Sequence, residues 1–75
     1  MRSNPGNVDA GQRYRETRSG FLGRAGPVWS VVNVFTGTDG LQYARLVSEA
    51  DPLLEKSISA AVLADKRRFL YVGGK

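Results

Sequence analysis

Clusters of cations near both ends of the chain carry the clearest chemical signal in this sequence. Arg13, Arg15 and Arg18 stand close to the start, and three consecutive cations at positions 66–68 run directly into Phe69. Arginine and lysine side chains neutralise phosphate oxygens, and neighbouring aromatic rings stack on bases. The pattern therefore favours a surface that contacts the backbone of RNA or DNA.

Two tyrosines and a further arginine extend this candidate surface. Tyr43 and Arg45 share one face of an expected strand, which predicts that the ring is exposed beside a cation. The full set of candidate nucleic-acid-binding residues is Arg13, Arg15, Arg18, Tyr43, Arg45, Lys66, Arg67, Arg68 and Tyr71. A structural role competes with this interpretation, because lysine and arginine on edge strands also prevent edge-to-edge aggregation.

The net charge of +4 is unevenly distributed over the 75 residues. Five arginines against two carboxylates give residues 1–26 a charge of +3, whereas residues 27–65 carry −3 and residues 66–75 carry +4. An acidic middle thus separates two basic ends. The ends act as one patch only if the fold brings them together.

The composition excludes most catalytic and metal chemistry. The chain has no cysteine and no histidine, which removes thiolate sites, the commonest zinc ligand and the commonest general base. No Ser-His or Cys-His pair can form, and the acidic segment 49–55 lacks the spacing of a calcium loop. We therefore expect a protein that is not an enzyme and that holds no cofactor and no metal.

A β-hairpin is the element that the sequence predicts most directly. Residues 28–36 are rich in valine and aromatic residues, which favours a central strand with Trp29 in the core. Asp39 and Gly40 form a favoured hairpin dipeptide, and Gly37 can take the positive φ of a bulge. Residues 41–48 then alternate with period two, as a half-buried strand does.

The segments before and after this hairpin are less regular. Residues 12–19 predict a half-buried edge strand anchored by Tyr14, and the glycines of 20–27 predict a loop. After Pro52 two interpretations compete. One is a helix over about 52–66 with a proline start, which gives an α+β fold with a three-stranded sheet; the other is a short strand, a helical turn and a closing strand. The alternating Ser-Ile-Ser segment favours the second.

These elements predict a single domain over residues 12–72. Residues 1–11 contain almost nothing apolar and are expected to form a flexible arm, and residues 73–75 a frayed tail. No apolar run is long enough to cross a membrane and the start lacks a secretory signal, so the expected location is cytoplasmic, without membrane contact.

The order of the motifs resembles that of small, mostly uncharacterised bacterial β proteins over residues 11–71. The motifs that carry the resemblance are GQRYRETRS, the strand opened by Trp29, FTGTDGLQYARLV, KSIS and LADKRRF. The layout is similar to SH3-like small barrels. The resemblance implies a mostly β fold, a five-stranded barrel with one short helical turn, in which the first and last strands are neighbours. It implies no activity.

A binding module without chemistry of its own is the function that these observations favour. Docking on a protein partner through an exposed sheet edge or an apolar groove is the first hypothesis. Contact with the phosphates of RNA or DNA is the alternative, and it predicts a steep salt dependence of the affinity because bound counterions are released.

Overall fold

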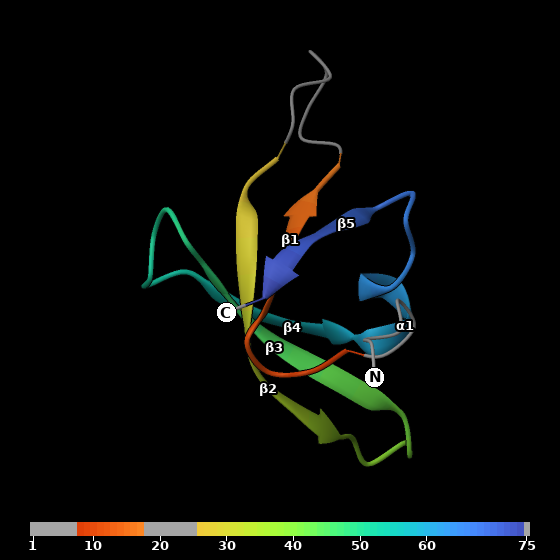
Figure 1. Ribbon diagram of the computed structural model, residues 1–75. Helices are drawn as coiled ribbons and strands as arrows, with labels where there is room; N and C mark the ends of the chain where they lie inside the picture. Colours follow the sequence, from red (N-terminus) through yellow and green to blue (C-terminus); the bar gives the residue numbers. More distant parts are fainter. Residues whose placement is uncertain (1–7, 18–25, 75) are drawn as a thin grey trace.

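Five strands and one short helix make up the described part of the chain. The structure is a computed structural model, and it describes residues 8–17 and 26–74 (Figure 1). The elements are β1 (Gln12–Glu16), β2 (Val28–Thr36), β3 (Gln42–Ser48), β4 (Glu55–Ser59), α1 (Ala60–Leu63) and β5 (Phe69–Gly74). The mostly β class expected from the sequence is confirmed.

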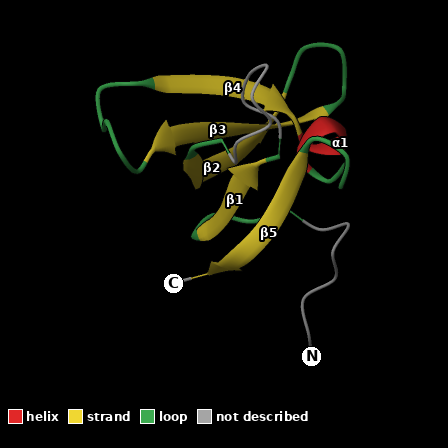
Figure 2. Ribbon diagram, turned by 90° about the horizontal axis from the view of Figure 1, so that it is seen from above, coloured by secondary structure: helices red, strands yellow, loops and turns green. Residues whose placement is uncertain are grey.

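The strands form one antiparallel sheet in the order β4-β3-β2-β1-β5. β4 and β5 are its two edges and do not pair with each other, so the sheet is not closed into the expected barrel (Figure 2). The first and last strands are neighbours, as expected. The prediction that β1 is an edge strand is wrong, because the chain returns through α1 and adds β5 to the free side of β1.

The β2–β3 hairpin has the predicted place and turn. Gly40 has a φ of 83°, and the Asp39 carboxylate accepts a hydrogen bond from the Leu41 N–H at 3.0 Å. Gly37, which could take a positive φ, does not have one; its N–H donates to the Leu41 carbonyl at 2.7 Å. The left-handed conformation is therefore needed at one turn position, where only glycine adopts it without strain.

The segment after Pro52 confirms the strand-and-turn interpretation and shows that a helix over 52–66 is wrong. β4 pairs with β3 over its whole length, and α1 is a single turn of four residues. Ser59 ends β4 and caps α1, because its hydroxyl accepts a hydrogen bond from the Val62 N–H at 3.2 Å. The cap lets the chain change from extended to helical geometry within one residue.

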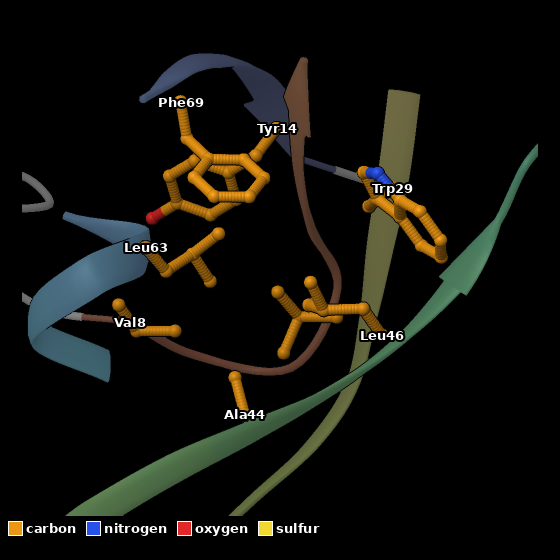
Figure 3. Close-up of a cluster of buried hydrophobic side chains, with 8 residues drawn as sticks. Val8, Tyr14, Trp29, Ala44, Leu46, Leu63 and Phe69 are labelled. Carbon is orange, nitrogen blue, oxygen red and sulfur yellow. The ribbon is translucent and has the colours of Figure 1, made fainter. Parts of the chain in front are cut away.

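The core lies on the concave face of the sheet, here called the inner face. Strand alternation directs Tyr14, Trp29, Leu46 and Phe69 there, and all four are buried. α1 directs Leu63 toward the rings of Tyr14 and Phe69 (Figure 3). The predicted core position of Trp29 is confirmed.

Both expected boundaries of the domain differ from the structure. Val8 lies within the expected flexible arm, yet its side chain is buried in the core. Gly73 and Gly74, expected in the frayed tail, belong to β5 and pair with Arg13 and Gln12. The overall polar or glycine-rich composition of these two segments did not indicate that one valine packs in the core or that two glycines extend the last strand. The rest of the arm, residues 1–7, and Lys75 lie outside the described residues.

Candidate functional site

The pairing of β1 with β5 brings parts of the two cation clusters together. Thr17 follows β1 and donates from its N–H to the Arg68 carbonyl at 2.9 Å. Its hydroxyl donates to the Arg67 carbonyl at 2.7 Å. Segments 50 residues apart in sequence are therefore joined at this corner of the sheet.

Arg13 is occupied by a carboxylate that the sequence pattern did not connect with it. Its Nε and Nη2 donate to the two Glu49 carboxylate oxygens at 2.6 and 3.1 Å. The Ser30 hydroxyl donates to the same carboxylate at 3.0 Å. The hydrogen bond from Arg13, followed by that from Ser30, lowers the pKa of Glu49. A bidentate pair of this kind leaves Arg13 little capacity to bind a phosphate.

Two further candidate arginines also have partners within the protein. Arg67 contacts Asp65, with 3.2 Å between its Nε and the Asp65 Oδ1. Arg45 donates to Asn33 at 3.2 Å and lies 3.6 Å from Glu55. Three of the seven predicted cations, Arg13, Arg45 and Arg67, are thus paired with carboxylates of the protein.

Arg15 contacts the protein in a different way, because its guanidinium donates to the Gly26 carbonyl at 3.2 Å. Arg18 lies outside the described residues. Lys66 and Arg68 are exposed, and within residues 8–17 and 26–74 they form no ion pair. They are the candidate cations with the most capacity for an external anion.

Tyr43 and Arg45 lie away from this corner, because β2 and β1 separate β3 from β5. The Tyr43 ring stacks on Phe35 with 5.7 Å between the ring centroids. Its hydroxyl donates to Asp39 at 2.6 Å, and this hydrogen bond is the main cause that lowers the pKa of Asp39. The two residues belong to the β2–β3 hairpin and do not join the candidate patch at β1 and β5.

A pocket of about 280 Å³ opens on the inner face, where β4 and β5 face each other without pairing. We call it the β4–β5 pocket; its lining residues are Glu16, Lys56, Ile58, Val62, Arg67, Arg68 and Phe69. Lys56 is the cation that the sequence analysis missed. Its Nζ lies 4.4 Å from the centre of the Trp29 ring and 3.6 Å from Glu16.

Glu16 is the single carboxylate in this lining, and its charge is already balanced. The Trp29 indole N–H donates to its Oε1 at 2.9 Å, and Lys56 is its ion-pair partner. The lining therefore combines three apolar side chains with three cations and one carboxylate.

The outer edge of β5 is the second feature that the search for charged motifs missed. Leu70, Tyr71 and Val72 are consecutive, uncharged and 47%, 51% and 39% exposed. No other strand of the described segments has three consecutive exposed apolar side chains. The uncharged run FLYVGG was visible in the sequence. It indicates an exposed apolar edge only once β5 is known to be an edge strand.

No family is assigned by comparison with known proteins, and no metal site is found among the described residues. Searches of family models, curated proteins and solved structures found no match to this chain. The described residues contain no group of three or more potential metal-ligating side chains, and none of their helices is long and apolar enough to cross a membrane.

Proposed function

We propose that the protein is a non-catalytic interaction module that binds an extended segment of a protein partner along β5. The observation that carries the proposal is the outer edge of β5, which pairs with no strand of the described residues and carries three exposed apolar side chains. An edge strand offers unpaired N–H and C=O groups, and a partner strand that satisfies them extends the sheet.

The register of the sheet identifies the backbone groups that a partner would use. The Arg68 carbonyl accepts from Thr17 across the β1–β5 pair, and backbone groups alternate in direction along an antiparallel strand. The N–H and C=O of Tyr71 are therefore directed away from β1. The Tyr71 ring remains partly on the inner face, where it packs edge-to-face on Tyr14 at 5.6 Å.

The two edges of the sheet differ in a way that favours β5 as the docking edge. β4 carries Glu55 and Lys56, and charged side chains on an edge oppose strand addition. β5 carries no charge from Phe69 to Gly74. One edge of the molecule is thus protected and the other is open to a partner.

Contact with RNA or DNA is a second candidate function, supported by the exposed cations Lys66 and Arg68, of which Arg68 lines the β4–β5 pocket. The pairing of Arg13, Arg45 and Arg67 with carboxylates weakens it. A titration with single-stranded RNA at low and physiological salt separates the two: phosphate binding weakens steeply with salt, whereas strand addition does not.

A matched pair of substitutions tests strand addition. Tyr71→Pro and Tyr71→Thr both remove the ring, but only proline lacks the N–H directed toward the partner. The ligand source is a displayed library of random peptides of about ten residues, long enough to span β5. Peptides selected on the wild type should bind the threonine variant and fail to bind the proline variant.

Circular dichroism of both variants checks that the sheet is retained. Equal binding to the two folded variants, or selection of no peptide by the wild type, contradicts docking on β5.

We further propose that the fold is an open form of the SH3-like layout and that the protein acts in the cytoplasm. The strand order and the helical turn before the last strand support the first proposal. Localisation of a tagged full-length chain by fluorescence microscopy tests the second.

A further inference from the structure

Lys66 and Arg68, the cations just before β5, form no ion pair with any residue that the structure describes. All seven aspartates and glutamates of the sequence lie among the described residues. Four of them form the ion pairs of Arg13, Arg45, Lys56 and Arg67, and none pairs with Lys66 or Arg68. Residues 1–7, 18–25 and 75 contain no acidic side chain that could do so.

Arg68 combines this free charge with a defined place. It lines the β4–β5 pocket and directly precedes the open edge of β5. Glu16 in the same pocket is held by Trp29 and Lys56. Asp65 nearby is paired with Arg67, whose hydrogen bond is the main cause that lowers the pKa of Asp65, and the charge of Arg68 adds a smaller contribution. The local charge therefore has an excess of cations at one end of an otherwise uncharged docking edge.

We propose that the segment that docks on β5 is an apolar strand with an aspartate or glutamate at one end, whose carboxylate binds Arg68 at the rim of the β4–β5 pocket. This inference rests on the proposed function. It adds to the proposed function the chemical character of the partner segment. Backbone groups along β5 form the strand pairing, and Arg68 selects for a negative charge and fixes the register.

The geometry of β5 sets the pattern expected in such a segment. Phe69 lies in the core and Tyr71 packs on Tyr14, so both face the inner side, whereas Leu70 between them faces the outer side. After Tyr71 the register of β5 against β1 shifts by one residue, so the alternation is not extended to Val72. A paired strand places its side chains next to these in the same alternation. An apolar residue should occupy the position beside Leu70, and the acidic residue should lie beyond Phe69, next to the pocket.

The test uses the same random peptide library, selected in parallel on the wild type, Arg68→Gln and Arg45→Gln. Arg45→Gln removes an equal charge from β3 and is the matched control. The wild type and the control should enrich peptides with Asp or Glu at one end of an apolar stretch. Arg68→Gln should lose this acidic preference.

Affinities of one selected peptide and its Gln or Asn counterpart then give the magnitude. Fluorescence anisotropy should show about three- to tenfold tighter binding of the acidic peptide to the wild type, the range for a partly exposed charge pair, and nearly equal binding of both peptides to Arg68→Gln. Selected peptides that need the Tyr71 N–H but show no acidic preference overturn this inference and leave docking on β5 intact. Peptides that do not need that N–H, or no enrichment, overturn both.

Discussion

At the scale of single residues, the ability of an arginine to bind an external anion depends on whether a carboxylate of the protein already pairs with it, and not on how many arginines the segment contains. Arg13 is one of five arginines that make the first third of the chain basic, yet it is held by Glu49 from a segment 36 residues away. No local pattern connects these two residues, because their contact depends on the β1–β2 and β2–β3 registers. The sequence therefore identifies the cations but cannot predict which of them pair with a carboxylate in the fold.

The Glu49 pair predicts a loss of stability in acid. The pKa of Glu49 in the folded protein is lowered below its ordinary value of 4.5 by Arg13 and Ser30. Its stabilising contribution is therefore present above pH 4.5 and is lost as the pH falls through the lowered value. Urea unfolding midpoints should fall over this acidic range, and less so in Glu49→Gln.

Glu55→Gln is the control for this experiment, because it removes one surface carboxylate that lies farther from its partner, 3.6 Å from Arg45. An unchanged acid response in Glu49→Gln would show that the Arg13–Glu49 contact does not stabilise the fold.

At the scale of elements, the hairpin was predictable and the edges were not. The valine-rich strand 28–36, the Asp-Gly turn and the alternation of residues 41–48 specify β2 and β3 locally. The position of β1 between β2 and β5 is decided by a long-range pairing instead. For this reason the sequence pattern predicted β1 as an edge strand and did not indicate that the run FLYV forms an edge strand.

The change from β4 to α1 depends on one side chain, which gives a prediction at this scale. Ser59→Ala removes the acceptor for the Val62 N–H and should lower the free energy of unfolding by about 1 kcal/mol, the usual effect of losing an N-cap. Chemical denaturation followed by circular dichroism measures it. Ser57→Ala, two residues earlier on exposed β4, is the control; equal effects would assign no capping role to Ser59.

At the scale of the whole molecule, a small core is shared between an open sheet and one helical turn. Leu46 and Leu63 are the largest fully buried side chains. They come from β3 and α1, so the turn contributes to the core as well as connecting β4 to β5. A long helix over residues 52–66 would bury a different set of side chains.

Leu63→Ala tests this contribution. Removing a fully buried leucine leaves a cavity and should cost about 2–5 kcal/mol of unfolding free energy, a large part of the stability of a domain this small. Leu53→Ala removes the same atoms from a side chain that is 92% exposed and should change the value by less than about 0.5 kcal/mol. Comparable urea midpoints for the two variants would contradict the packing of α1.

The placement of Trp29 also makes its fluorescence a useful probe of the pocket and of the fold. It is the single tryptophan of the chain, its indole is buried and hydrogen-bonded to Glu16, and the Lys56 ammonium lies over its ring beside the pocket. Its emission spectrum reports one defined environment, without labels and without contributions from other indoles. A ligand that displaces Lys56 changes that environment, whereas unfolding exposes the ring to water, so one intrinsic signal distinguishes occupation of the pocket from loss of the fold.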